Sequence, residues 1–269
     1  MLDIVRTALE STAPVPLPRA PRGGPLRART PRTHRFRLAE SGYPAAMTDD
    51  AAGVLFDVDG TLVDTPYLHV ACWWQALRQY GHEVPMARIH RAIGMGSDHI
   101  LDHLLGAERD HGDDASMADA HTALYAVYWQ RLRPTPGAAD LLRACASRGL
   151  RVVLASSASA REMRALRAAL DADDVIAAAT SADDAGESKP APDILAAALQ
   201  ASGLPAERTS FVGDAVWDVY SAVKLDIPCV GLTCGGLAEA ELREVGAVEV
   251  YQDPAALLAA LDRSVLTQR

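Results

Sequence analysis

The sequence predicts an α/β fold: a doubly wound, Rossmann-like parallel sheet core with an inserted all-helical domain. Two observations predict this class. From Val54 onward, short apolar runs bounded by turn residues alternate with segments of helical period, which is typical of βαβ units. Between Thr65 and Pro134 this alternation stops, and the segments are helical in character. Because 49% of the 269 residues are apolar, the chain can bury a sizeable core.

The expected strands are short and almost continuously apolar, as in parallel sheets that helices cover on both faces. The first of them, Val54-Leu55-Phe56, leads directly into two acidic residues. We expect strands at residues 54–58, 151–156, 175–179, 209–213, 229–233 and 248–251.

Amphipathic segments separate these strands, and a further helical stretch of about 70 residues interrupts the sheet after its first strand. We therefore expect a core formed by residues 47–65 and 134–269 and a helical domain formed by residues 66–133. The core helices are predicted at 137–148, 159–170, 191–202 and 215–224, and the inserted helices at 67–80, 86–92, 97–105 and 116–132.

Composition excludes several classes of function. The net charge of −9 argues against a general nucleic-acid binder, since such proteins carry basic surfaces. No run of 18 uninterrupted apolar residues is present, so no membrane span is expected. The four cysteines form no CxxC motif and no Cys/His cluster, which favours free thiols in a reducing cytoplasm.

Residues 1–46 differ from the rest of the chain. They contain eight arginines, seven prolines and only three acidic residues, without apolar periodicity. Three interpretations fit this composition: a mis-called or nonfunctional extension upstream of Met47, a disordered functional tail, or a targeting segment.

Polar residues follow several of the predicted strands at the point where each strand ends. Ligands of doubly wound sheets bind beyond the carboxyl ends of the strands, so these side chains are expected to meet in one crevice. They are Asp57 and Asp59 after the first strand, Ser156 and Ser157 after the second, Asp214 and Asp218 after the fourth, and Lys189 before helix 191–202.

These residue types indicate phosphoryl transfer. Clustered carboxylates at the end of a sheet suit a hard divalent cation, most naturally Mg²⁺. A lysine can neutralise a phosphate or a nucleophilic carboxylate. No histidine or cysteine is placed to act as the nucleophile, but an aspartate can attack phosphorus and form an aspartyl-phosphate. A second aspartate can then protonate the leaving oxygen and later activate water.

Four short motifs resemble those of the haloacid dehalogenase-like superfamily of hydrolases, in order along the chain. They are DVDGT at 57–61, LASSA at 154–158, SKPAPD at 188–193 and GDAVWD at 213–218. The resemblance covers residues 53 to about 260. Each motif lies where a predicted strand or helix boundary requires it.

The resemblance implies catalytic roles for the matching residues. Asp57 would be the nucleophile and Asp59 the general acid and base. Lys189 and Ser156, or Ser157 in place of Ser156, would hold the phosphoryl group. Members that cleave carbon–halogen bonds lack the second aspartate, so the presence of Asp59 favours phosphoryl transfer.

The resemblance also implies a metal site. Mg²⁺ would be bound by Asp57, by the main-chain carbonyl of Asp59 and by Asp214, with Asp218 as a supporting or alternative ligand. Thr61 would orient the loop at the phosphate-binding site.

The helical stretch at 66–133 resembles the α-helical cap of the phosphoglycolate phosphatase-like and β-phosphoglucomutase-like branch. Such caps close over the site, exclude water and contact the leaving group. The segment HRAIGMGSD at 90–98 is the expected contact region, in which Arg91 either binds an anionic or hydroxylated substrate or is a plain surface residue. Gly94 and Gly96 there permit close approach of the backbone.

Together these features predict a Mg²⁺-dependent phosphatase that hydrolyses a small phosphorylated metabolite through an aspartyl-phosphate. Two alternatives remain open at this point: a β-phosphoglucomutase-like phosphomutase that uses the same intermediate, and a non-catalytic protein that binds a phosphorylated ligand. We expect a cytoplasmic monomer or homodimer without nucleic-acid or membrane partners.

Overall fold

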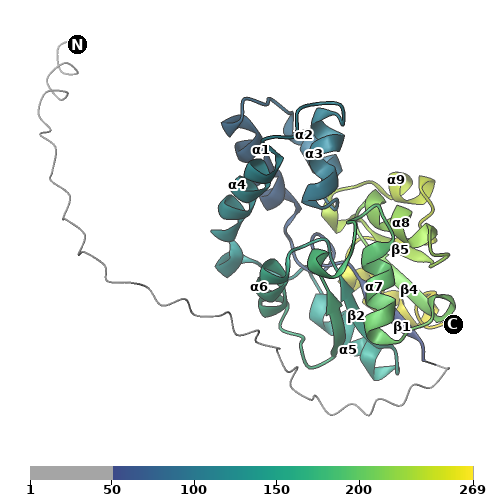
Figure 1. Ribbon diagram of the computed structural model, residues 1–269. Helices are drawn as coiled ribbons and strands as arrows, with labels where there is room; N and C mark the ends of the chain where they lie inside the picture. The colour runs from purple at the N-terminus through teal and green to yellow at the C-terminus, as the bar shows by residue number, and fades with distance from the viewer. Residues whose placement is uncertain (1–50, 269) are drawn as a thin grey trace, which may run out of the picture. The chain divides into compact units, whose positions relative to one another are not determined.

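The computed structural model describes residues 51–268, which contain a six-stranded parallel sheet in the order β3-β2-β1-β4-β5-β6 (Figure 1). This order confirms the predicted doubly wound class, because the chain direction across the sheet reverses between β1 and β4. The strands are β1 Gly53–Phe56, β2 Arg151–Ala155, β3 Ile176–Thr180, β4 Thr209–Gly213, β5 Cys229–Leu232 and β6 Glu249–Tyr251. The N-terminal segment 1–46 lies outside the described residues.

Strand β1 is buried on both faces because helices cover both sides of the sheet. Val54 and Phe56 belong to an apolar cluster with α5, α6 and α10, whereas Leu55 belongs to a second cluster with α7, α8 and α9. This alternation follows from the two-residue period of a strand. The helices are α5 Ala138–Ser147, α6 Ala160–Leu170, α7 Asp193–Ser202, α8 Val216–Val223, α9 Glu239–Glu244 and α10 Pro254–Ala260.

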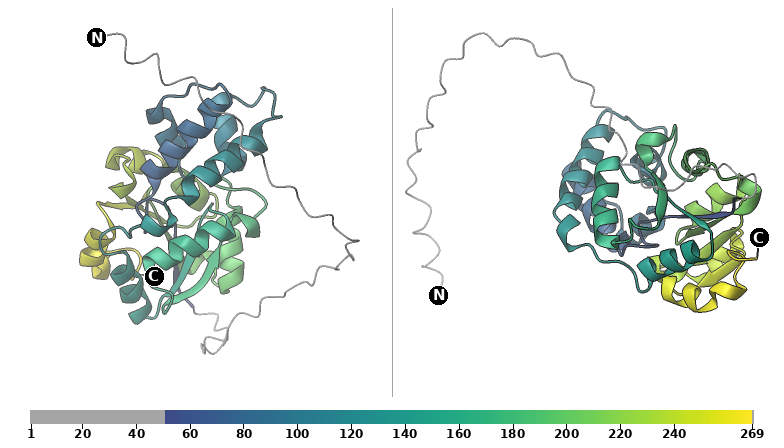
Figure 2. Two further views of the ribbon diagram at one scale, coloured as in Figure 1. Left: turned by 90° about the vertical axis from the view of Figure 1, so that its left-hand side faces the viewer. Right: turned by 90° about the horizontal axis from the view of Figure 1, so that it is seen from below.

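Between β1 and β2 lies a group of helices that we call the helical insert. Figures 1 and 2 show its helices gathered at one end of the α/β part. The helices have their own apolar cluster, which includes Trp73, Leu77, Ile89 and Leu101. The helical insert comprises α1 Pro66–Gln79, α2 Met86–Ala92, α3 Ser97–Leu105, α4 Asp114–Ala126 and the 3₁₀ turn η1 Trp129–Arg131.

One sequence-based expectation about the helices was wrong, and one helix was missed. The single helix expected at 116–132 is divided, because the Tyr128 N–H bonds to the Tyr125 carbonyl and tightens the chain into a 3₁₀ turn. The helix α10 was not predicted, although Asp253 caps it by accepting a bond from the Ala256 N–H, with Pro254 in its first turn. The remaining 3₁₀ turns are η2 Ala182–Asp184, η3 Ala206–Arg208, η4 Thr233–Gly235 and η5 Leu261–Arg263.

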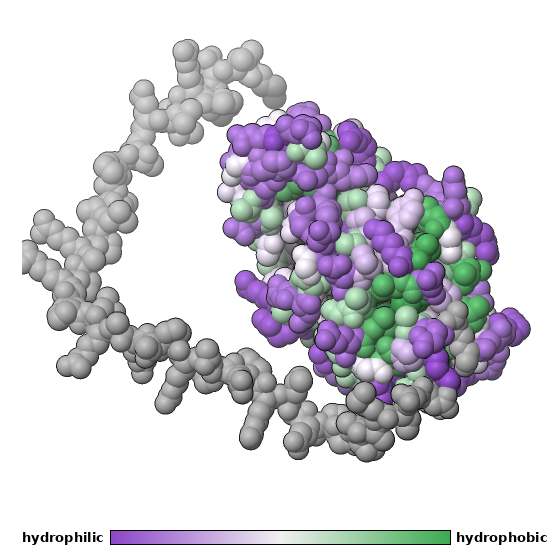
Figure 3. All heavy atoms as spheres, turned by 45° about the vertical axis from the view of Figure 1, so that its right-hand side comes forward, coloured by the Kyte–Doolittle hydropathy of each residue, from purple (hydrophilic) through white to green (hydrophobic). Residues whose placement is uncertain are grey.

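The exposed surface is mainly polar. Figure 3 shows that hydrophilic side chains cover most of one face, with smaller apolar areas between them. The exposed large apolar residues include Tyr220 and Val223 on α8 and Val127 after α4. Within residues 51–268, no helix has the length and apolar character needed to span a membrane.

We expect Leu55→Ala to destabilise the protein by about 2–5 kcal/mol, because the side chain is fully buried at the centre of the sheet. Urea unfolding followed by circular dichroism measures this change. Val127→Ala is the control, since Val127 is 65% exposed, and it should alter stability by less than about 0.5 kcal/mol. Equal effects of the two substitutions would contradict the described packing.

Candidate active site

Three carboxylates lie together at the carboxyl ends of β1 and β4, the neighbouring strands at the centre of the sheet. Asp57 follows β1, Asp214 follows β4, and Asp218 lies in the first turn of α8. All three side chains are buried. One carboxylate oxygen from each lies within 4.8 Å of one oxygen from each of the other two. The structure therefore brings together the acids that the sequence predicted at one crevice.

Lys189 lies among these acids and is fully buried. Its Nζ forms an ion pair with Asp57 and a second one, at 2.7 Å, with Asp218. The ammonium group also lies 5.2 Å from the centre of the Phe211 ring. Burial disfavours the charged form, but the charges of Asp218 and Asp57 outweigh it and raise the pKa of Lys189.

The loop after β1 is shaped around Asp214. Gly60 has a φ of +89°, and a Cβ there would lie 2.4 Å from the Asp214 carboxylate. The backbone of Gly235 also approaches closely, since a Cβ there would overlap the same carboxylate. The buried Thr61 hydroxyl donates to Asp214 Oδ1 at 2.8 Å. Thr61 thus ties the loop to Asp214, and its role in orienting the loop for phosphate stays a prediction.

These buried acids fit a divalent cation. Burial raises the pKa of Asp57 to about 7, with the charges of Asp218 and Asp59 adding to the effect and Lys189 opposing it. Burial and the charges of Asp57 and Asp218 likewise raise the pKa of Asp214. A single lysine therefore does not neutralise the negative charge of the carboxylates. A hard divalent cation bound by their oxygen atoms would neutralise it. Asp218 already bonds Lys189 and accepts from the Ala215 N–H at 3.0 Å.

Asp59 has different surroundings, although it is only two residues from Asp57. Its Oδ1 accepts a hydrogen bond from the Thr65 hydroxyl at 2.9 Å and lies 3.3 Å from His69 Nε2. Its Oδ2 accepts from the Ser156 hydroxyl at 3.3 Å. Burial opposes ionisation, but the hydrogen bond and charge of His69, with the two hydroxyl donors, hold the pKa of Asp59 below its usual range.

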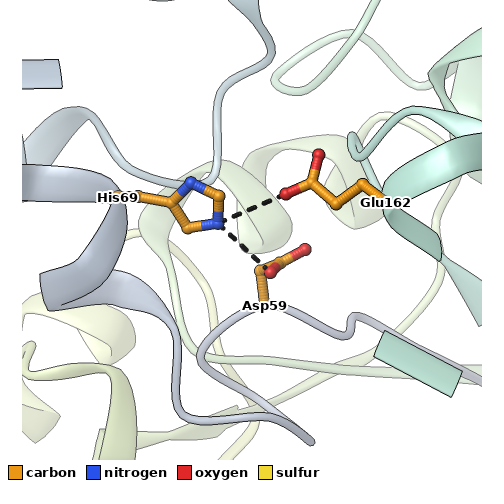
Figure 4. Close-up of side chains that lie close together, drawn as sticks. All are labelled: Asp59, His69 and Glu162. Carbon is orange, nitrogen blue, oxygen red and sulfur yellow. Dashed lines mark hydrogen bonds and ion pairs between the residues drawn. The ribbon is translucent and has the colours of Figure 1, made fainter. Parts of the chain in front are cut away.

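His69 on α1 connects Asp59 to two further residues. Its Nε2 lies between Asp59 and Glu162 of α6, 3.6 Å from Glu162 Oε1 (Figure 4). Its Nδ1 lies 3.1 Å from His121 Nε2 on α4. Burial favours the neutral ring, but the hydrogen bond and charge of Asp59 and the charge of Glu162 raise the pKa of His69. Burial lowers the pKa of His121 and raises that of Glu162 to about 7.

A cavity of about 230 Å³ opens between the carboxyl end of the sheet and the helical insert. We call it the central cavity. Asp57 and Asp59 line it from the core, together with Ser156 and Ser157. The helical insert contributes residues from α1, α4 and the loop between α2 and α3, including His121. A ligand in this cavity would therefore contact both parts of the chain.

The helical insert is bonded to the core around this cavity. The Gly96 N–H donates to the Ser188 hydroxyl at 3.0 Å, and the Ser157 hydroxyl donates to the Gly94 carbonyl at 3.3 Å. Trp217 Nε1 donates to the Arg91 carbonyl at 3.0 Å. These bonds hold the loop at 93–97 against the core at one side of the central cavity.

The side chain of Arg91 does not line the central cavity. It is 60% exposed, and its guanidinium forms an ion pair with Glu241 on α9. The structure thus provides no contact between Arg91 and the predicted phosphate site, because this helix face is turned toward α9. The backbone of Gly94 and Gly96, by contrast, lines the cavity as expected.

Sequence reasoning missed the residues around Asp59. Thr65, His69 and Trp73 recur at intervals of four residues, which places them on one side of α1. This spacing could have identified His69, which we had not singled out. Glu162 gave no such signal, because a glutamate three residues after a serine is typical of an ordinary helix cap. The Ser159 hydroxyl indeed accepts a hydrogen bond from the Glu162 N–H.

Comparison with known proteins gives a consistent result. A family model described as haloacid dehalogenase-like hydrolase matches residues 51–226. The chain is 29% identical over 211 residues to a phosphoglycolate phosphatase of Shigella boydii, covering 70% of this chain and 83% of that protein. It is also 29% identical to the Arabidopsis thaliana protein SUPPRESSOR OF QUENCHING 1, chloroplastic, but spans only 21% of that protein's length.

Solved structures share the fold. A hydrolase from Pseudomonas syringae has a TM-score of 0.75 and 33% identity, covering 79% of this chain and 98% of that one. A β-phosphoglucomutase from Clostridium difficile has a TM-score of 0.69, with 79% and 96% coverage. The sequence identity to the Clostridium difficile protein is only 18%, so this similarity shows a shared fold alone.

We expect the stability contributed by His69 to depend on pH. Because the folded protein raises the pKa of His69 above 6.5, its charge stabilises the fold fully below about pH 6.5 and ceases to do so as the pH rises through the raised pKa. The loss of melting temperature in His69→Gln should therefore be largest near pH 6 and shrink toward about pH 9. Thermal unfolding in EDTA measures it.

His82→Gln is the control, since His82 lies in the turn between α1 and α2 and does not line the central cavity. A loss in His69→Gln that stays constant or grows between these pH values would show that the imidazolium does not stabilise the cluster.

Proposed function

Because this chain belongs to the haloacid dehalogenase-like hydrolase family, we propose that it is a Mg²⁺-dependent phosphatase that hydrolyses a small phosphomonoester. The phosphoglycolate phosphatases among its relatives support phosphatase activity. The observation that carries the proposal is the pair Asp57 and Asp59, which line one cavity but have different partners. Because Asp57 is paired with Lys189 and Asp59 with His69, the two carboxyl groups can do different work, one attacking phosphorus and the other transferring a proton.

In the first half of the reaction, a carboxylate oxygen of Asp57 attacks phosphorus and the bond from phosphorus to the alcohol oxygen breaks. Asp59, having taken up a proton, passes it to the departing alcohol. His69 and Thr65 orient Asp59 for this transfer through their contacts with its Oδ1. Lys189 and the Ser156 hydroxyl stabilise the charge on the phosphoryl oxygens.

In the second half, Asp59 takes a proton from a water molecule, and the resulting hydroxide oxygen bonds to phosphorus. The bond between phosphorus and Asp57 breaks, which releases phosphate and restores the free carboxylate. We propose that residues 66–133 act as a cap that excludes other water during these steps. The hydrogen bonds of Gly94 and Gly96 to the core support this role.

Asp57, Asp214 and the main-chain carbonyl of Asp59 would hold Mg²⁺, with Asp218 as a supporting or alternative ligand. When bound, Mg²⁺ supplies positive charge that offsets the clustered carboxylates and the phosphoryl oxygens. The proposal of magnesium rests on a donor set made up of oxygen atoms, most of them from carboxylates.

We further propose a cytoplasmic enzyme that acts as a monomer or homodimer. All four cysteines are free thiols, which supports a reducing compartment.

A phosphomutase is the second candidate, since it would use the same aspartyl-phosphate on Asp57. The hydrogen bonds that fasten the helical insert to the core favour it, because a mutase must keep water from the intermediate while the substrate turns. Interconversion of sugar 1- and 6-phosphates without release of phosphate would establish this function in place of the phosphatase.

We expect Asp57→Asn to lower phosphate release from a panel of phosphomonoesters by at least about 10³-fold, since an amide cannot attack phosphorus. Its melting temperature should be preserved, because Lys189 keeps its bond to Asp218. Asp64→Asn is the control: it removes the same charge from an exposed position in the same loop and should retain activity. Equal turnover by Asp57→Asn and the wild type would leave a non-catalytic phospholigand binder as the better interpretation.

Removing metal should abolish turnover. We expect EDTA to reduce phosphate release to background and excess Mg²⁺ to restore it. Asp214→Asn should raise the Mg²⁺ concentration for half-maximal activity by at least about tenfold, whereas Asp64→Asn should not. Full activity of the metal-free wild type, verified by metal analysis, would rule out the proposed Mg²⁺ dependence.

A further inference from the structure

The wall of the central cavity beyond Asp59 is acidic and aromatic. Glu162 and Asp183 line it, together with the rings of His69, Trp73 and His121. No arginine or lysine belongs to the set of described residues that line this cavity. Apart from His69, the wall therefore offers no cationic side chain to the part of a substrate that extends away from the phosphoryl group.

Glu162 has bonding capacity that the protein does not use. Its Oε1 is shielded from solvent and accepts no hydrogen bond from any described residue. The nearest cationic group is His69 Nε2 at 3.6 Å, which already bonds Asp59. Since a buried carboxylate oxygen without a donor is costly, a donor supplied by the ligand would be favoured at this atom.

Glu162 lies within reach of the leaving group. Carboxylate oxygens of Asp59 and Glu162 lie within 4.8 Å of each other, and His69 lies between them. In the mechanism above, the leaving oxygen is bonded to Asp59. An amine nitrogen two carbons from that oxygen is roughly 3–4 Å away from it, so it can reach Glu162.

The aromatic rings beside Glu162 also suit a cation. The rings of Trp73 and His121, which both line the central cavity, are stacked with centroids 4.2 Å apart. Aromatic rings combined with carboxylates form the usual surroundings of bound ammonium groups.

A substrate with an anionic group on its leaving group, in addition to the phosphate, would find few cationic partners for that group in this wall. Lys189 is fully buried between Asp57 and Asp218, at the phosphoryl end of the site. Arg91 is paired with Glu241 and does not line the cavity. A carboxylate at this place would instead lie near Glu162.

We propose, on the basis of the phosphatase function above, that the preferred substrate is the phosphate ester of an amino alcohol. Its ammonium group lies beside Glu162 and the aromatic rings, and its ester oxygen lies beside Asp59. This substrate class differs from the phosphoglycolate named for the relatives, in which a carboxylate occupies the same position along the molecule.

Three esters of equal length test this proposal: phosphoethanolamine, 2-hydroxyethyl phosphate and 2-phosphoglycolate. Their affinities for the 269-residue Asp57→Asn variant with Mg²⁺ are measured by calorimetry, and their kcat/KM values with the wild type. We expect phosphoethanolamine to bind at least about tenfold more tightly than phosphoglycolate, with the neutral ester between them, and kcat/KM to follow this order. Equal or tighter binding of phosphoglycolate would overturn the proposal.

Glu162→Gln should lower the preference for phosphoethanolamine over the hydroxyethyl ester by at least about fivefold. Glu239→Gln is the matched control, because it removes the same charge from the exposed surface of α9, and the preference should stay within about twofold. If Glu162→Gln weakens both esters equally, Glu162 only supports the fold and the proposal fails.

The two readouts separate this inference from the phosphatase function. The expected order of binding without turnover of any ester would support the amine site and reject the phosphatase. Turnover of all three esters, led by phosphoglycolate, would support the phosphatase and reject the amine site.

Discussion

The buried ammonium group of Lys189 is the interaction on which the active site depends. It pairs with Asp57 on one side and Asp218 on the other, at a point where three carboxylates converge and no solvent reaches the lysine. Without it, like charges would face one another in surroundings of low dielectric constant, where repulsion is strong. Because the lysine balances only part of this charge, the arrangement also explains why the site suits a divalent cation.

The sheet makes this concentration of charge possible. Strands β1 and β4 are neighbours at the centre, so the residues that follow them meet even though more than 150 positions separate Asp57 from Asp214. Leu55 and Phe211 are paired in register on these strands and belong to the apolar cluster beneath α7 and α8. The free energy gained by burying this apolar surface offsets the cost of confining the acids.

The sequence predicted this central part well and the helical insert less completely. The doubly wound class and the meeting of Asp57, Asp214 and Lys189 follow from strand and helix boundaries, which local patterns mark clearly. The neighbours of Asp59 could not be predicted in the same way, since His121 and Glu162 come from separate helices whose contact depends on how the helical insert packs. The prediction that Arg91 contacts the substrate did not consider Glu241 on α9, which forms an ion pair with the Arg91 guanidinium.

The helical insert therefore does more than cover the site. Asp57 depends on the core through Lys189, whereas Asp59 depends on the helical insert through His69. The face of α1 that carries His69 also lines the space for the leaving group, next to Glu162. A different chemical group in that space would alter the surroundings of His69. The hydrogen bond and charge of His69 in turn lower the pKa of Asp59. In the proposed mechanism, selection of the leaving group and the proton transfer to it would thus be linked through one side chain, His69.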